Sequence, residues 1–197
     1  MKLTNNSHEN IELVKKLSVQ YTDDVFIAQL TAAQAILEGG LERTSGGSQL
    51  AVKYCNLFGI KPGFIRTGTA TPGVVWLPTN EFVHNVGMVK KDQPFLSNLN
   101  IEDSLKQHVE LFKGLSRYSN LFNCKSFEEI ASNVYEDGYA TDPNYPQKLI
   151  DTYHRHDLMY LGVDAGMNLP KLIKLIGAYY FGEKPGEKPG EKKEGEE

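Results

Sequence analysis

The chain has 197 residues, of which 40% are hydrophobic, and a formal net charge of −4 at pH 7. This size suits one domain with a real core, and the acidic balance without a long Lys/Arg run excludes a partner bound mainly through phosphates, such as nucleic acid. Two cysteines, Cys55 and Cys124, make no disulfide framework and lack metal-site spacing, so free thiols are expected.

The first part of the chain has a helical pattern. Residues 8–20 predict an amphipathic helix, and Thr22 and Asp23 are candidate N-caps for a second helix ending near Gly39. Ser48 predicts the cap of a short third helix. In the second helix, apolar residues recur at helical spacing and predict a stripe facing the core: Phe26, Leu30, Ala33 and Leu37.

Residues 61–96 change character, because glycines and prolines punctuate them. The run at 74–77 is typical of a strand. A small hairpin is predicted with a strand at 81–83, a turn at 84–87 and a second strand from Met88.

The helical pattern then returns. One helix is predicted over 101–114, and a second begins at a capping box of Ser126 and Glu129 and ends at Gly138. A last core helix is predicted over 146–161. The helix over 101–114 has an apolar face made of Ile101, Leu105, Val109 and Phe112.

These elements predict an α+β fold, with a mostly helical body, a small β-hairpin lobe and a ligand cleft between them. We expect one domain over 1–165, an amphipathic helix over 166–182 and a disordered Glu/Lys/Pro/Gly tail over 183–197. The amphipathic helix is expected to pack on the domain, with contact to a membrane or envelope surface as the alternative.

The stretch AQAILEGG carries its only ionisable group, Glu38, at the end of an apolar helix. The negative end of the helix dipole and the desolvation by Ile36 and Leu37 both disfavour a charged carboxylate, so the pKa of Glu38 should rise. A glutamic acid that keeps its proton can act as a general acid. The alternative is a solvated glutamate before an ordinary glycine cap.

Four blocks along the chain resemble the glucosaminidase family of peptidoglycan hydrolases, which includes flagellar muramidase-like domains, autolysins and phage lysins. The blocks are AQAILEGG, SQLAVKYCNLFGIK, LPTNEF and GYATDPNYPQKL. The resemblance covers about residues 20–160. It implies a lysozyme-like fold and an endo-β-N-acetylglucosaminidase, which cleaves the β-1,4 bond between N-acetylglucosamine and N-acetylmuramic acid in peptidoglycan strands without a cofactor.

The resemblance also assigns roles to residues. It makes Glu38 the catalytic acid, Glu81 the candidate second carboxylate and Tyr139 a group that orients the acetamido group or the water. The 2-acetamido group of the substrate is the alternative to Glu81. Phe58, Trp76 and Tyr145 are candidate sugar-binding aromatics, with packing in the core as the alternative for each. Asp142 is expected as a helix cap, with Pro143 in the first turn.

The sequence departs from the family pattern after the acid. Gly39 stands where the family commonly has serine, and Leu41-Glu42-Arg43 replaces the usual Trp-Gly. Glu42 is therefore a second candidate for the acid, although a flexible loop would hydrate it.

Histidines elsewhere do not predict a metal site. In His154-Arg155-His156-Asp157 the two imidazoles are two residues apart and do not face each other on a helix. His108 lies on the apolar side of its helix and is expected as a satisfied, partly buried histidine rather than a ligand.

The first sixteen residues lack an apolar segment, so no secretory signal is expected, and no run is long enough to span a bilayer. A wall-directed enzyme made in the host cytoplasm fits a monomeric phage endolysin that acts in the wall or periplasm after release. The alternatives are a virion-associated lysin, a lytic transglycosylase and a catalytically inactive glycan-binding module.

Overall fold

The computed structural model describes residues 1–63, 73–83 and 87–162, with the backbone alone at 80–83 and 88. The turn at 84–86, the helix predicted over 166–182 and the tail over 183–197 lie outside the described residues. The elements in chain order are α1 (Ser7–Ser18), α2 (Val25–Gly39), α3 (Gln49–Tyr54), β1 (Gly73–Val83), β2 (Gly87–Ser97), α4 (Ile101–Gly114), the 3-10 helix η1 (Ser116–Asn123), α5 (Phe127–Glu136), α6 (Tyr145–Arg155) and the 3-10 turn η2 (Leu158–Tyr160).

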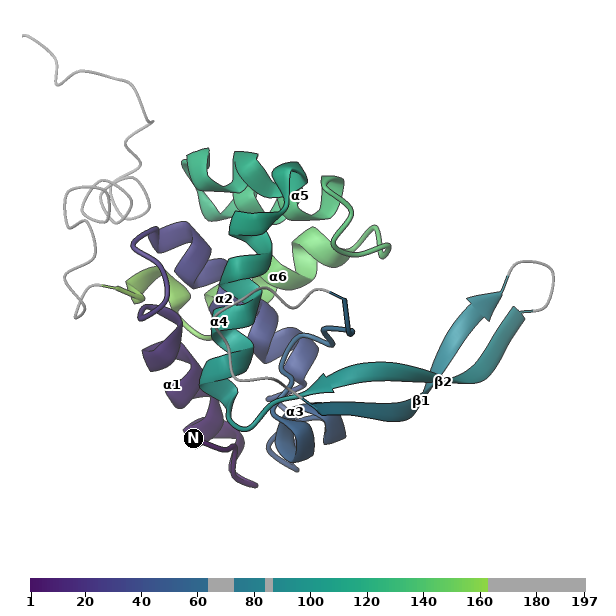
Figure 1. Cartoon of the computed structure of the whole chain (residues 1–197). Coiled ribbons are helices and arrows are strands. Elements are labelled where there is room, and N and C mark those ends of the chain that lie inside the picture. The colour runs from purple at the N-terminus through teal and green to yellow at the C-terminus, as the bar shows by residue number, and fades with distance from the viewer. Residues whose placement is uncertain (64–72, 84–86, 163–197) are drawn as a thin grey trace, which may run out of the picture.

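Helix α2 runs through the centre of a helical body and contacts α1, α4, α5 and α6 (Figure 1). Every residue from Val25 to Ile36 is buried, so the helix has no solvent-facing side along that length. The predicted single stripe is therefore too narrow. Three buried polar residues bond to other elements: Gln29 Nε2 to the Met159 carbonyl, Thr31 Oγ1 to His108 Nδ1 and Gln34 Nε2 to Tyr145 Oη.

The cap of α2 differs from the prediction. Asp24 is the N-cap, and its Oδ1 accepts the backbone N–H groups of Phe26 and Ile27 at 2.9 and 3.2 Å. Thr22 Oγ1 accepts the N–H of Asp24 itself, before the first turn of the helix. The predicted caps Thr22 and Asp23 were wrong, because the carboxylate nearest the first turn satisfies its free donors better.

The other predicted starts are confirmed. Ser48 Oγ accepts the N–H of Ala51 at the start of α3, and Ser126 Oγ accepts the N–H of Glu129 at the start of α5. The apolar face predicted for α4 is buried along its length: Ile101, Leu105, Val109 and Phe112. No helix in the described ranges is long and apolar enough to cross a membrane.

Two predictions near the C-terminal end of the domain were incomplete. The last helix ends at Arg155 rather than near residue 161, because Asp157 adopts a left-handed conformation with φ of 52° and interrupts it. The 3-10 helix η1, directly after α4, was not predicted, since its spacing of three does not produce the pattern of an α-helix.

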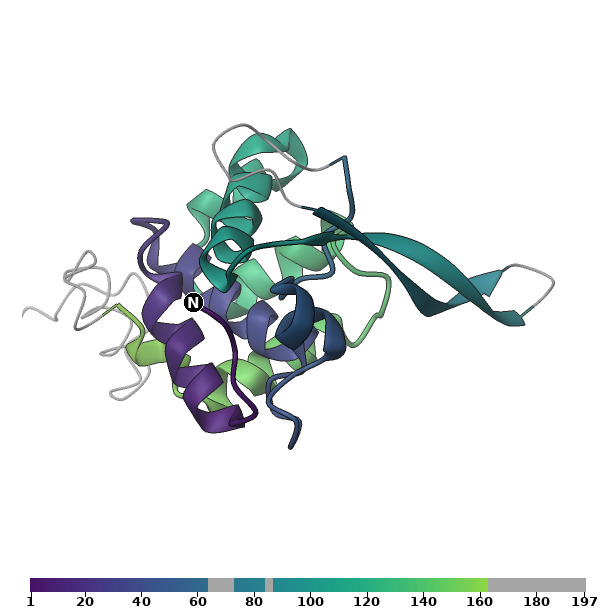
Figure 2. The same cartoon turned by 60° about the horizontal axis from the view of Figure 1, so that its bottom comes forward.

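The hairpin is longer than predicted. Strands β1 and β2 pair antiparallel from Gly73 opposite Ser97 to Val83 opposite Gly87, so the two predicted strand pieces form one strand. Both views show it extending away from the helical body (Figures 1 and 2). Its base is anchored there, where Leu96 is buried and donates its N–H to the Ile60 carbonyl at 2.9 Å.

The exposed part of the hairpin carries two prolines. Pro78 lies opposite Asp92, and Pro94 lies opposite Trp76, which is 64% exposed. The mostly helical body with one hairpin agrees with the predicted α+β architecture.

Candidate active site

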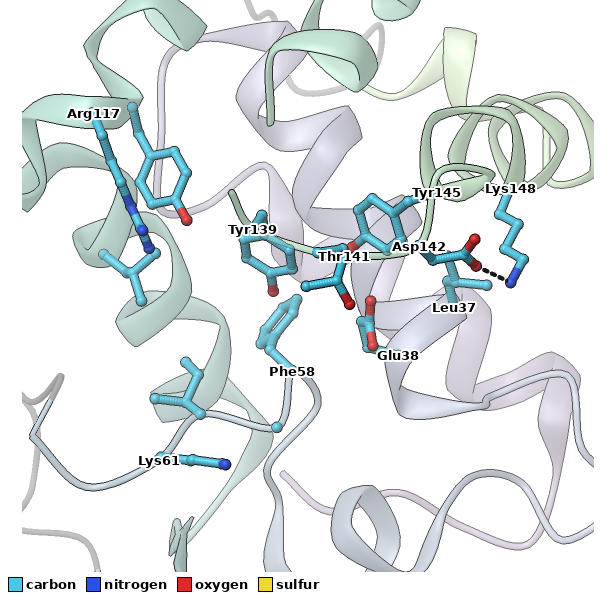
Figure 3. Close-up of a pocket in the computed structure, with 15 residues that line it drawn as sticks. Leu37, Glu38, Phe58, Lys61, Arg117, Tyr139, Thr141, Asp142, Tyr145 and Lys148 are labelled. Atoms are coloured by element: carbon cyan, nitrogen blue, oxygen red, sulfur yellow. Dashed lines mark hydrogen bonds and ion pairs between the residues drawn. The ribbon is translucent and has the colours of Figure 1, made fainter. Parts of the chain in front are cut away.

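A cleft of about 660 Å³ lies beside the C-terminal end of α2 (Figure 3). Its lining comes from segments far apart in the sequence, so only the folded chain assembles it. These are Leu37 and Glu38 in α2, residues 58–61, Leu111 in α4, Arg117 and Tyr118 in η1, residues 139–142, and Tyr145 and Lys148 in α6.

Glu38 lies in the last turn of α2, directly before Gly39, the last residue of the helix. Gly40 follows as the C-cap in the left-handed conformation, with φ of 61°, and its N–H bonds to the carbonyls of Ile36 and Leu37. Gly39 is buried, and a Cβ there would lie 3.2 Å from Leu41 Cδ2 and 3.4 Å from Leu57 Cδ2. A side chain at position 39 would therefore press on Leu41, which agrees with glycine in place of the serine that the family commonly has.

The carboxyl of Glu38 faces the cleft and keeps solvent access through its open side. Even so, the protein atoms around it disfavour the charged form, so burial raises its pKa above the ordinary value of 4.5. A hydrogen bond from Tyr145 and the charge of Lys148 oppose this rise without cancelling it. The direction agrees with the expectation from sequence.

Tyr145 connects Glu38 to the core. Its hydroxyl accepts a hydrogen bond from Gln34 Nε2 at 2.9 Å and bonds to the carboxylate of Glu38. Because the Gln34 amide supplies one proton, the tyrosine is left to donate its own to Glu38. Burial raises the pKa of Tyr145, which keeps the phenol protonated as a donor.

Tyr139 stands next to these groups. Its ring stacks on that of Tyr145, with centroids 5.9 Å apart and an interplanar angle of 23°. Burial and then the charge of Glu38 raise the pKa of Tyr139 well above 10, so its hydroxyl stays neutral within reach of the Glu38 field.

Phe58 forms another wall of the cleft. It stacks on His108 with centroids 3.8 Å apart and an angle of 13°. His108 is completely buried, and desolvation lowers its pKa to about 3, so it is a neutral packing residue. Its Nδ1 contacts Thr31 Oγ1 at 3.3 Å, whereas its Nε2 is buried without a hydrogen bond in the described part of the chain. The expected partly buried, satisfied histidine was therefore wrong on both points, because the rings around His108 exclude water and offer no acceptor.

Asp142 also lines the cleft, but both of its oxygens are used. Oδ1 accepts the N–H of Asn144 at 2.9 Å, and Oδ2 pairs with Lys148 Nζ at 2.5 Å. The hydrogen bond from Lys148 is the main cause of its lowered pKa. The predicted cap was placed two residues early, because Asn144 precedes α6 and Pro146 rather than Pro143 occupies its first turn.

The structure does not bring all predicted residues together. Trp76 is exposed on the hairpin and does not line the cleft. The backbone of Glu81 lies opposite Val89, in the part of the hairpin that extends from the body (Figure 1); its side chain lies outside the description.

Glu42, the alternative acid, lies outside the lining of the cleft. Its Oε1 bonds to Arg155 at 2.5 Å and to His156 Nε2 at 2.8 Å. Burial alone would raise its pKa, but these two partners outweigh burial and lower it. An acid that releases its proton so readily is poorly suited to protonate a sugar oxygen at neutral pH.

Sequence reasoning missed three cationic lining residues, Lys61, Arg117 and Lys148. Lys61 ends the NLFGIK block, and Lys148 follows Tyr145 by three positions on α6. The family blocks could therefore have pointed to both residues. Arg117 carried none, because η1 was not predicted. Within residues 1–63, 73–83 and 87–162, no three His, Cys, Asp or Glu residues form a group that could hold a metal ion.

Comparison with known proteins agrees with this geometry. A family model described as glucosaminidase, mannosyl-glycoprotein endo-β-N-acetylglucosaminidase, matches residues 16–158. Exo-glucosaminidase LytG of Bacillus subtilis is 30% identical over 137 residues, which are 67% of this chain and 45% of that protein. Peptidoglycan hydrolase FlgJ of Pseudomonas aeruginosa is 32% identical over 123 residues, 62% of this chain and 30% of FlgJ. The chain thus spans less than half the length of these curated relatives.

Solved structures share the fold. The catalytic domain of the autolysin Auto from Listeria monocytogenes superposes with a TM-score of 0.64 at 21% identity, covering 80% of this chain and 88% of that domain. A peptidoglycan hydrolase mutant from Sphingomonas sp. A1 gives a TM-score of 0.54 at 25% identity, covering 78% of this chain and 92% of that one. The predicted fold class is confirmed.

Proposed function

Because the chain belongs to the glucosaminidase family, we propose that residues 1–165 form the catalytic domain of a peptidoglycan hydrolase, an endo-β-N-acetylglucosaminidase. It would cleave the β-1,4 bond on the reducing side of N-acetylglucosamine in the glycan strand. The observation that carries the proposal is Glu38, a carboxyl with a raised pKa in a cleft lined by aromatic side chains.

Glu38 serves as the general acid. Its proton passes to the glycosidic oxygen as the bond from that oxygen to C1 breaks, and positive charge develops on the sugar ring. The raised pKa keeps the proton in place until then. The hydrogen bond that Tyr145 donates stabilises the carboxylate left behind, so the same group can accept a proton from the attacking water.

The second catalytic group is the 2-acetamido group of the substrate, with Glu81 as the alternative. Among the described cleft-lining residues, Asp142 is the only carboxylate besides Glu38, and hydrogen bonds engage both of its oxygens. Tyr139 stands close enough to Glu38 for the two to interact electrostatically, which supports a role in orienting the acetamido group or the water. Glu81 would need the hairpin to close over the bound glycan.

The aromatic side chains supply sugar-binding surface. Phe58, Tyr139 and Tyr145 line the cleft around Glu38 (Figure 3). Phe58 and Tyr145 are only 7% and 4% exposed, so they pack mainly in the core and only a small part of each can contact a sugar. We propose that Trp76 contacts a more distant part of a long glycan strand, because it is exposed on the hairpin, outside the cleft.

The test is digestion of purified cell walls, followed by mass spectrometry of the new chain ends. Walls should lose turbidity, and the new reducing ends should be N-acetylglucosamine. An anhydro sugar would instead indicate a lytic transglycosylase, and absence of any cleavage together with wall binding would indicate a glycan-binding module. A Glu38→Gln chain provides the background of the assay.

One relative carries the name exo-glucosaminidase, which favours release of units from strand ends as the second candidate. Product length separates the two modes. Internal cleavage yields a broad distribution of fragments early in the reaction, whereas attack from the ends yields small products from the start.

A finer proposal concerns the biological setting. We propose release from an infected bacterium as a phage endolysin, with a virion-associated lysin as the alternative. Mass spectrometry of purified particles would separate them, because only the virion-associated lysin would be found in the particle.

A further inference from the structure

A chain of two hydrogen bonds reaches Glu38 from the buried side of the cleft. Gln34 Nε2 donates to Tyr145 Oη at 2.9 Å, and Tyr145 in turn bonds to the Glu38 carboxyl. Gln34 is fully buried and does not line the cleft, so it cannot contact a bound glycan. Any part that Gln34 has in the reaction must therefore pass through Tyr145.

The side chains at the two ends of the first bond are held in place. Gln34 lies in α2, four residues before Glu38, in the stretch of the helix that is buried on every side. Tyr145 begins α6, where its N–H donates to the Asp142 carbonyl at 2.9 Å and its ring stacks on that of Tyr139. Because both side chains are packed, the phenol oxygen keeps its position between the amide and the carboxyl (Figure 3).

The stability of the fold does not account for a glutamine at position 34. Its Oε1 is buried and has no hydrogen-bond partner in the described part of the chain. A buried polar atom without a partner destabilises a fold, whereas methionine has a similar length and would fill the same space without this cost. The hydrogen bond to Tyr145 is what the amide offers and a methionine could not.

We propose that Gln34 is a positioning residue for the acid: its amide donates to Tyr145 Oη and so directs the phenol proton to the Glu38 carboxyl. This inference rests on the proposed function and adds to it a residue that acts through Tyr145. A hydroxyl that accepts one hydrogen bond is polarised and donates its own more strongly. Gln34 thus strengthens the bond that stabilises the carboxylate once the proton has passed to the sugar oxygen.

The direction of the effect on Glu38 follows from its surroundings. The bond from Tyr145 lowers the pKa of Glu38, so a weaker bond lets this pKa rise. The charge of Lys148 also lowers it, and the neutral Tyr139 lies within the field of Glu38. Substitution of Gln34 leaves these groups unchanged, together with the other titratable groups that line the cleft: Lys61, Arg117, Tyr118 and Asp142.

The test replaces the amide with an apolar side chain of similar length. In Gln34→Met, the titration midpoint of the Glu38 carboxyl, followed by heteronuclear NMR, should rise by about 0.2–0.5 pH unit. The alkaline limb of the wall-digestion profile should move in the same direction, and the rate below that limb should fall about two- to threefold. These changes should be smaller than those in Tyr145→Phe, because the phenol can still donate when the amide is gone.

Gln29→Met is the matched control. Gln29 lies in the same helix, is equally buried and also has an Oε1 without a partner among the described residues. Its Nε2 bonds to the Met159 carbonyl, which is not part of the cleft. Gln29→Met should therefore leave the titration of Glu38 and the pH profile unchanged. Thermal unfolding of Gln34→Met should show no loss of stability, since a purely structural role would destabilise the fold without moving the titration.

A double variant shows whether Gln34 acts through Tyr145. In Tyr145→Phe the ring has no oxygen for the amide, so the further change Gln34→Met should not move the titration of Glu38 again. Equal shifts with and without the Tyr145 hydroxyl would overturn the inference. An unchanged midpoint in Gln34→Met would also overturn it, and so would a lower one, because the phenol would then be donating to Gln34.

Wall digestion by the wild-type chain decides the proposed function separately. A chain that cleaves walls, but whose Glu38 titrates in Gln34→Met as in the wild type, refutes only the role of Gln34. A chain that shows the shifted titration without cleaving walls refutes the proposed function, while the control of Glu38 by Gln34 through Tyr145 stands.

Discussion

Two carboxylates, Glu38 and Glu42, are four residues apart at the end of the same helix, yet their pKa values move in opposite directions. Glu38 faces the cleft, where burial raises its pKa against the pull of Tyr145 and Lys148. Glu42 lies past the glycine turn, where Arg155 and His156 overcome burial and lower it. The turn at Gly40 separates Glu38, whose pKa is raised, from Glu42, whose pKa is lowered by its ion pairs.

This difference shows that side-chain partners, rather than position at a helix end, determine which of the two can act as an acid. The helix dipole disfavours charge near both groups. Arg155 and His156 are enough to reverse the effect of burial on the pKa of Glu42. Tyr145 and Lys148, which is already paired with Asp142, are not enough to do so at Glu38.

The largest expected effect separates the two by activity. Glu38→Gln should reduce wall hydrolysis by about 10²–10⁴-fold, because it removes the proton that leaves with the glycosidic oxygen. Glu42→Gln should retain most of the activity. Turbidity loss of purified walls measures both, and equal losses in the two variants would contradict the assignment of the acid.

A smaller effect concerns the pH dependence. Activity should decline as pH rises through the raised pKa of Glu38, since the acid then loses its proton. Tyr145→Phe removes a hydrogen bond that lowers this pKa, so the pKa rises further and the alkaline limb of the pH profile should move to higher pH. The rate below that limb should fall about two- to tenfold, as the carboxylate loses a donor. Tyr135→Phe, in α5, is the control, and a limb that moves to lower pH would refute the role of Tyr145.

A substitution at Gly40 tests how much the turn between the two carboxylates depends on glycine. Gly40→Ala should lower the free energy of unfolding by about 1–2 kcal/mol, because φ of 61° is costly for a residue with a Cβ. The added carbon would also lie 2.7 Å from Arg43 Nε, so that side chain must move. Urea unfolding measures the loss; an unchanged midpoint would show that the turn adapts at no cost.

The smallest expected effect concerns the free energy of unfolding, which the pKa shifts of Glu42 and Glu38 change in opposite directions. The lowered pKa of Glu42 stabilises the fold above the ordinary value of 4.5, and this stabilisation is lost as pH falls through the lowered value. Because Glu42 is 40% exposed, Glu42→Gln should cost only about 0.5 kcal/mol at pH 7 and less in acid.

Glu38 should behave in the reverse manner. Its folded-state pKa is raised, so stability falls as pH rises above 4.5 through that pKa, and Glu38→Gln should be at least as stable as the wild-type chain at pH 7. Unfolding at pH 7 and in acid, measured on both variants, checks the signs. A destabilised Glu38→Gln would mean that the carboxylate is well solvated.

The sequence predicted most of the helical body because local chemistry sets its boundaries. The Ser48 and Ser126 caps and the apolar face of α4 are readable one turn at a time. The start of α2 was misplaced because Thr22, Asp23 and Asp24 are all good caps, and only the direction of the chain decides among them. A 3-10 helix such as η1 leaves no such pattern.

The sequence predicted the site residues that lie within the family blocks. It missed those that only the fold brings to the cleft. Glu38, Tyr139 and Tyr145 lie in the family blocks and meet in the cleft. Arg117 reaches the cleft from an unpredicted element, and the link from Gln34 through Tyr145 joins residues 111 positions apart. No local pattern shows contacts of that kind.

The hairpin raises a separate problem of solubility. Each of its two strands is an edge, and an unpaired edge can recruit a strand from another molecule and begin aggregation. Pro78 and Pro94 lack an N–H to offer such a strand, and Lys90 and Lys91 add exposed charges to β2. These features work against the recruitment of further strands by the projecting lobe.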